Sequence, residues 1–105
     1  MAVFVLVTTH SSDQCPTSNA KIRQMFTADP SAMMKLAEKL GVKLIAGPYV
    51  STGHRGFAVV ESPKVEAVHE FAMQSGLVQW NSVEIVHVLP QAEAIKDIAG
   101  LKPIY

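Results

Sequence analysis

The hydrophobic and polar positions along the chain predict four strands. Residues Ala2–Thr9 (AVFVLVTT) are β-branched or aromatic on both parities, which is typical of a central strand covered on both sides. Residues 42–50 and 54–61 predict a second and a third strand, and the short turn between them predicts a hairpin. Gly47–Pro48 marks a bulge or a sheet edge. Residues 82–89 predict the fourth strand.

Two helical regions are expected between these strands. The first begins after Pro16 and is broken at Pro30, because proline disfavours a helical conformation in the residue before it. Asp29 can cap the second segment, and Gly41 ends it. The apolar stripe of the whole first helical region consists of Ile22, Met25, Phe26, Met33, Met34, Ala37 and Leu40.

The second helical region opens at Ser62–Pro63 and ends at Gly76. Its expected inner face is Val65, Val68, Phe71 and Ala72. After the fourth strand, Gln91–Ala99 predicts a short final helix, followed by a loose tail over residues 101–105.

The element order β-α-β-β-α-β restricts the topology. Right-handed crossovers place the third strand between the first and second, and the fourth beside the first. Both helical regions then cover one face of a four-stranded antiparallel sheet, which is an α+β ferredoxin-like sandwich. Val3, Val5 and Val7 alternate with Phe4 and Leu6 along the first strand, so the uncovered face is apolar too and a homodimer through sheet faces is expected. The 105 residues form one domain, with residues 2–90 as its core and 91–105 as helix and tail.

Composition excludes several classes of protein. Apolar residues make up 49% of the chain, which argues against disorder, and a single cysteine excludes an internal disulfide. Nine basic and nine acidic residues cancel without forming a basic cluster, so nucleic-acid binding is not expected. The apolar run at residues 2–7 is too short for a membrane span and lacks signal-peptide flanks. We therefore expect a cytoplasmic protein without a membrane partner.

The element order and the pattern GFAVVES…WNSVEIVHVLP resemble the dimeric α/β-barrel superfamily over roughly residues 2–90. That superfamily includes muconolactone-isomerase-like, antibiotic-biosynthesis-monooxygenase-like and stress-responsive small domains. The resemblance implies the fold and a dimer. It does not imply one reaction, because members bind haem, bind organic substrates without cofactors, or have no known chemistry.

A possible metal site follows from the topology. The end of the first strand lies beside the start of the antiparallel third strand, which brings His10 near His54. Cys15 lies in the loop that leaves the first strand. Two imidazoles and a thiolate suit zinc or copper, with Asp13 or water completing the sphere. The first functional hypothesis is therefore a metal-binding domain, with a metalloenzyme as one form of it.

Other interpretations of these residues stay open. Histidines are common at strand ends, and Cys15 can be an inert thiol. Alternatively, Cys15 is a reactive thiol whose pKa is lowered by a following helix N-terminus, with His10 as its base. A domain whose only role is assembly is also consistent with the sequence.

The alternative function is a cofactor-free monooxygenase- or isomerase-like enzyme, or a small-molecule-binding protein, with a cavity against the helices or the dimer partner. Glu61 and Glu84 lie in otherwise apolar strands, where burial would make either a usable base. His87 shares its parity with Ile85 and is expected in the core or a lumen. Arg55 and Trp80 are candidate contacts for an anionic or aromatic ligand at the rim that carries His10.

Overall fold

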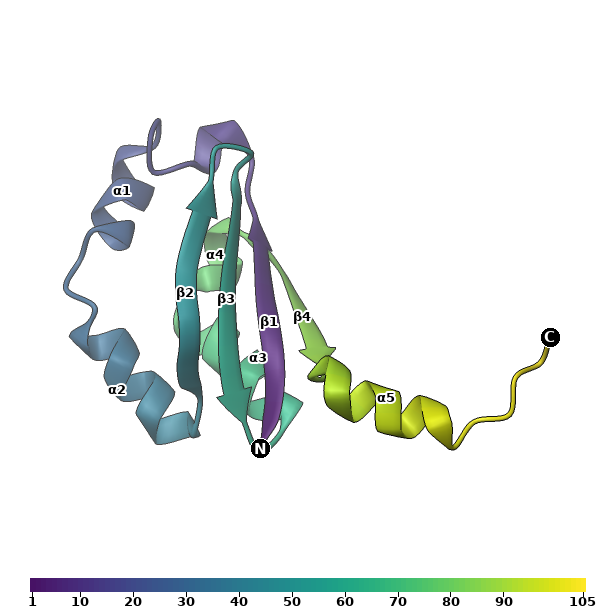
Figure 1. Ribbon diagram of the computed structural model, residues 1–105. Coiled ribbons are helices and arrows are strands. Elements are labelled where there is room, and N and C mark those ends of the chain that lie inside the picture. The colour runs from purple at the N-terminus through teal and green to yellow at the C-terminus, as the bar shows by residue number, and fades with distance from the viewer.

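The computed structural model describes residues 1–105 and has an α+β fold with one antiparallel sheet (Figure 1). Its strands are β1 (Ala2–Thr9), β2 (Lys43–Ser51), β3 (Arg55–Ser62) and β4 (Ser82–Val88). The strand order β2-β3-β1-β4 is the predicted one. The ferredoxin-like arrangement expected from the element order is therefore confirmed.

Five α-helices and one short 3-10 helix connect or follow the strands. They are η1 (Ser12–Gln14), α1 (Ala20–Phe26), α2 (Ser31–Leu40), α3 (Val65–Gln74), α4 (Leu77–Trp80) and α5 (Gln91–Ala99). The predicted break at Pro30 is present, and the Asp29 carboxylate accepts a hydrogen bond from the Ser31 N–H at 3.0 Å. Sequence patterns did not predict α4, a single turn that follows Gly76 in the left-handed region.

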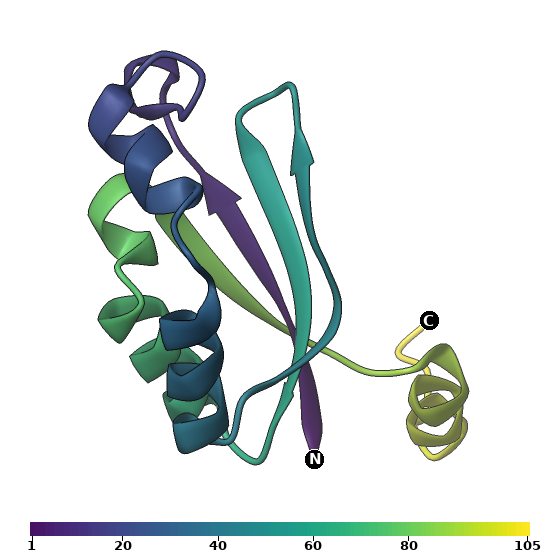
Figure 2. The same cartoon turned by 90° about the vertical axis from the view of Figure 1, so that its left-hand side faces the viewer.

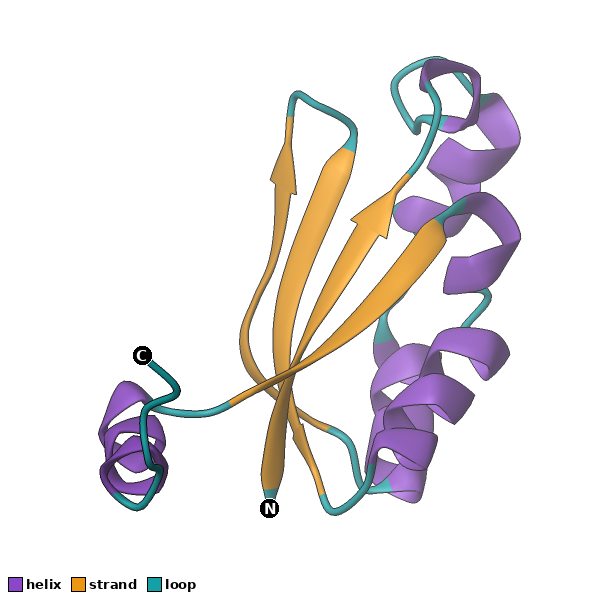
Figure 3. Cartoon of the chain, turned by 90° about the vertical axis from the view of Figure 1, so that its right-hand side faces the viewer, coloured by secondary structure: helices purple, strands orange, loops and turns teal.

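The core lies between the sheet and the helices α2, α3 and α4. Helix α1 lies over the same face of the sheet (Figures 2 and 3). Phe4, Leu6 and Val60 reach it from the central strands. The buried stripe of α3 is Ala67, Val68, Phe71 and Ala72. Val65 was expected in that stripe but is the first residue of α3 and is exposed.

The α2 stripe also differs from the prediction. Leu36, Ala37 and Leu40 pack against the core, whereas Met33 and Met34 are exposed. Side chains along β1 alternate between the two faces of the sheet. Phe4 and Leu6 are buried under the helices, so the residues between them lie on the opposite face, which α1 to α4 leave uncovered. No helix of the protein combines the length and the apolar character needed to cross a membrane.

Strand register places three chain segments at one rim of the sheet. Thr9 pairs with Arg55 of β3 and with Ser82 of β4. The residues just outside these pairs are His10, His54 and Asn81. The rim therefore gathers one histidine after β1, one before β3 and an asparagine before β4.

Candidate metal centre

His10 and His54 face each other across the β1–β3 ladder, as the antiparallel register predicts. The N–H of His10 donates to the carbonyl of His54 at 3.1 Å, which extends the ladder by one pair. Their ring centroids lie 5.3 Å apart with an interplanar angle of 72°. His54 belongs to the turn between β2 and β3 and has φ of 60°, in the left-handed region that residues with a Cβ rarely adopt.

Cys15 comes to the same place through the loop that follows β1. Its N–H donates to the carbonyl of Ser12 at 3.3 Å, at the end of η1. Its own carbonyl then accepts from the N–H groups of Ser18 and Asn19 at 3.0 and 2.8 Å. These bonds curl the chain so that the Cys15 side chain turns inward, and the residue is only 7% exposed.

The helix expected directly after Cys15 starts later. Asn19 is the N-cap of α1, and its side chain accepts from the Ile22 N–H at 3.1 Å. The prediction that a helix N-terminus lowers the pKa of Cys15 was therefore wrong about the cause. Pro16 therefore lies in a turn and not in the helix, which begins only after the better capping residue, Asn19.

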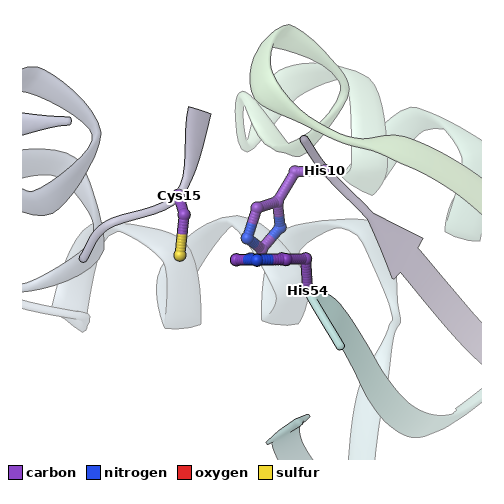
Figure 4. Close-up of side chains that lie close together, drawn as sticks. All are labelled: His10, Cys15 and His54. Carbon is purple, nitrogen blue, oxygen red and sulfur yellow. The ribbon is translucent and has the colours of Figure 1, made fainter. Parts of the chain in front are cut away.

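The donor atoms of His10, Cys15 and His54 converge. All three lie within 4.8 Å of one another, and Figure 4 shows the side chains directed toward a common space. Ligands of one zinc or copper ion at ~2.0–2.3 Å stand roughly 3.3–4.0 Å apart in tetrahedral or trigonal geometry. A contraction of about 1 Å, within the reach of side-chain rotation, would bring the three donors to one ion.

A hydrogen bond from the sheet rim fixes the ring of His10. Its Nδ1 lies 3.1 Å from Oδ1 of Asn81, and the amide nitrogen of Asn81 donates to the carbonyl of Leu77 at 3.2 Å. That second bond orients the amide, so Oδ1 faces His10 as an acceptor and Nδ1 carries the proton. Nε2 of His10 is then a lone-pair donor. It is buried and has no hydrogen-bond partner.

Groups around the Cys15 thiol favour its ionised form. The Thr17 hydroxyl lies 3.0 Å from Sγ and donates to it. This bond and the Thr17 backbone N–H are the largest causes that lower the pKa of Cys15 from 9.0 to about 6. A thiolate therefore predominates at neutral pH, and the thiolate is the form that binds metals.

No carboxylate joins the three donors. Asp13, named as a possible fourth ligand, is exposed and lies outside the cluster. The Ser11 hydroxyl donates to its carboxylate and is the main cause that lowers the pKa of Asp13. With three protein donors, a fourth position would fall to water or an external ligand.

An open hollow of about 570 Å³ borders His10. Its lining consists of Thr9, His10, Ser11, Gln14, Val78, Gln79, Trp80, Asn81 and Ser82. Trp80 packs against His10 with ring centroids 5.2 Å apart and against Phe26 at 6.3 Å. This aromatic contact forms a wall beside the imidazole.

The residues proposed for a cofactor-free enzyme do not come together. Glu61 pairs with Val3 and is half-buried, and Glu84 pairs with Val7 and is exposed, both on the sheet face away from the helices. His87 pairs with Phe4, at 5.2 Å between ring centroids, on the other face. It is exposed because β4 is an edge strand, so the expectation of a core histidine was wrong.

Arg55 and Trp80 share the rim, as predicted, but not one pocket. Trp80 lines the hollow beside His10, whereas the guanidinium of Arg55 lies 5.2 Å from the ring centroid of Phe57.

Sequence patterns missed the roles of Thr17 and Asn81. The strand order places Asn81 at this rim, but no sequence pattern indicates its contact with His10. The Thr17 contact depends on the turn over residues 15–19, for which the sequence offers only the general signal of Pro16 and small polar residues.

No family model, curated protein or solved structure matches this chain. The resemblance to dimeric α/β-barrel proteins therefore stays a prediction, and function has to be inferred from the geometry of the site.

Proposed function

We propose that this protein binds one zinc or copper ion through His10, Cys15 and His54. The observation that carries the proposal is Nε2 of His10, which is buried without a hydrogen-bond partner among donors of the right type. An unpaired buried polar atom costs about 1–3 kcal/mol. A metal bond would satisfy this lone pair, while Asn81 supports the opposite ring nitrogen, as is usual for ligating histidines.

The donor set selects the class of ion. Two imidazoles and a thiolate favour borderline and soft metals, whereas calcium and magnesium require several oxygen ligands. Zinc would take the three residues and a water, which is the open arrangement found at catalytic zinc. Copper would take them as a trigonal set of two histidines and a cysteine.

The lowered pKa of Cys15 also suits a nucleophilic thiol, with His10 as base. Burial favours the metal interpretation, because Cys15 is only 7% exposed and a small ion reaches Sγ more readily than a bulky substrate does. Two imidazoles beside one thiolate also exceed what a nucleophile and its base require.

The first test is metal analysis and titration of protein made without a histidine tag. We expect one zinc or copper ion per chain, and His10→Ala, Cys15→Ser and His54→Ala should each weaken binding at least tenfold. His69→Ala and His87→Ala are matched controls, because both histidines are exposed and neither belongs to the cluster. Equal affinity of all five variants, or no binding by the parent chain, would refute the proposal.

A second measurement separates the metals and tests the cysteine. Copper(II) bound to a thiolate gives an intense visible charge-transfer band, which Cys15→Ser should abolish. Zinc is silent, but it should slow alkylation of Cys15 by occupying the thiolate. A Cys15→Ser variant that binds as tightly as the parent would reduce the site to a two-histidine pair.

A further inference from the structure

The hollow beside His10 is distinct from the cluster of three donors. Neither Cys15 nor His54 lines it, so the hollow and the cluster share only the imidazole of His10. Its volume of about 570 Å³ is within the ~300–1,000 Å³ of ordinary small-molecule sites. The hollow is therefore a second candidate site at the same rim of the sheet.

One wall of the hollow is a tryptophan that its neighbours hold in place. Gly76 has φ of 85°, which starts α4 directly after α3 and brings Trp80 to the rim. The indole packs on the ring of His10 and meets that of Phe26 edge-on, at 88°. The residue is half-buried, so part of the ring stays accessible. A ligand would meet an aromatic surface that needs no further ordering.

The free polar groups of the lining are uncharged. Thr9, Gln79 and Ser82 are exposed, and their side chains form no hydrogen bond within the protein. Thr9 and Ser82 are register partners on β1 and β4, so their side chains lie side by side. Asn81, by contrast, uses both ends of its amide on groups of the protein. Two hydroxyls and one amide are thus available to a ligand, and each can both donate and accept.

The charge of the lining restricts the ligand further. No lysine, arginine, aspartate or glutamate lines the hollow, and Nδ1 of His10 is already bonded to Asn81. An ionised group placed here would lose part of its hydration without gaining an opposite charge. The hollow therefore favours a neutral ligand over a phosphate, a carboxylate or an amine.

A sugar ring has the groups that this lining requires. One face of a pyranose is a patch of C–H groups that can lie on an indole, and its rim carries hydroxyls that both donate and accept. A nucleobase fits less well, because it has two apolar faces and the hollow offers a single aromatic wall.

We propose that the hollow binds a neutral sugar, whose C–H face lies on Trp80 and whose hydroxyls bond to the free side chains of α4 and of the β1 and β4 ends. The site uses groups outside the His10, Cys15 and His54 cluster, so it does not depend on the metal ion. A chain that binds a sugar but no metal would refute the metal proposal and leave this one intact.

Titration of the metal-free protein with sugars tests the site. Trp80 is the single tryptophan, so its fluorescence reports on the hollow. With a chelator present, at least one of glucose, galactose, mannose, N-acetylglucosamine and cellobiose should change the emission saturably, with a dissociation constant on the order of 1 mM. Sorbitol, an open-chain polyol without a ring face, should not.

Three results would overturn the proposal. The first is the lack of a saturable change with any of the five sugars. The second is an equal response to sorbitol, which would show an effect of the solvent and not of a bound ring. The third is a saturable response to adenosine without one to the sugars, which would show a site for planar ligands.

Two variants locate the sugar in the hollow. Gln79→Leu and Ser82→Ala should each raise the dissociation constant about 3- to 10-fold, the usual effect of one lost hydrogen bond. Both residues are exposed, so the circular dichroism of the variants should match that of the parent. Gln91→Leu is the matched control, because Gln91 is exposed at the start of α5 and does not line the hollow. Equal affinities in all three variants would place the sugar elsewhere and refute the assignment.

Discussion

Asn81 holds Nδ1 of His10 at 3.1 Å and leaves Nε2, on the opposite side of the ring, buried and unpaired. The asparagine directly precedes β4 and the histidine directly follows β1, so the contact depends on the pairing of these two strands. In the proposed metal site Asn81 would therefore be a positioning residue, because it fixes the tautomer and the direction of the His10 ring without offering a donor to the ion itself.

Asn81→Leu should lower metal affinity about 10- to 100-fold, because the leucine cannot accept the Nδ1 proton. Asn81→Asp retains an acceptor at the same position and should restore most of the affinity. Isothermal titration with zinc provides both values. Equal losses in the two variants would point to a packing defect and not to a lost hydrogen bond.

Thr17→Val should raise the pKa of Cys15 from about 6 toward 9.0, since the hydroxyl at 3.0 Å is the largest cause of the lowered value. The substitution preserves shape and removes only the donor. Alkylation rates of the metal-free protein across a pH series would give the midpoint. Thr27→Val serves as control, because that hydroxyl donates to the carbonyl of Arg23 in α1.

The stability of the metal-free protein should depend on pH through Cys15. Between pH 6 and 9 the folded thiol is ionised while the unfolded thiol, at its ordinary pKa of 9.0, is protonated. The unfolded chain then binds more protons, so the contribution of Cys15 to stability is fully present above pH 9 and is lost as pH falls through 9 to 6. Urea unfolding in the presence of a chelator should show this slope in the parent and not in Cys15→Ser.

His54→Gly should separate stability from function. At φ of 60° glycine avoids the Cβ clash, so the metal-free glycine variant should be about 1 kcal/mol more stable than His54→Ala. Both variants should lose metal affinity to the same extent. If His54→Gly is the less stable of the two, the turn is not strained and the histidine has a packing role.

The sequence predicted the parts of this protein that depend on alternation and chain direction. Strand order followed from crossovers, and the meeting of His10 with His54 followed from the antiparallel pairing of β1 and β3. Contacts made by irregular backbone were not predictable. Thr17 reaches Cys15 only because the chain curls over residues 15–19, and a periodic pattern contains no information about such a turn.

The exposed fraction of a side chain was also harder to predict than the face of the strand or helix on which it lies. His87 has the parity of Ile85, as expected, yet it is exposed because β4 has no neighbour on its outer edge. Val65 likewise has helical spacing to Val68 but lies at the first turn of α3. Position within the finished sheet or helix decides both cases, and that position is not a local property.

Because His10 and His54 meet at the end of the β1–β3 ladder, the proposed metal binding would depend on the completion of folding. A chain that has not paired β1 with β3, or that pairs them one residue out of register, has the two imidazoles on different faces or far apart. It would then bind the ion much more weakly than the native chain does. Binding to the native state alone adds stability that grows with the logarithm of free metal concentration. The ion would thus stabilise the native register of β1 and β3 relative to every shifted pairing of the two strands.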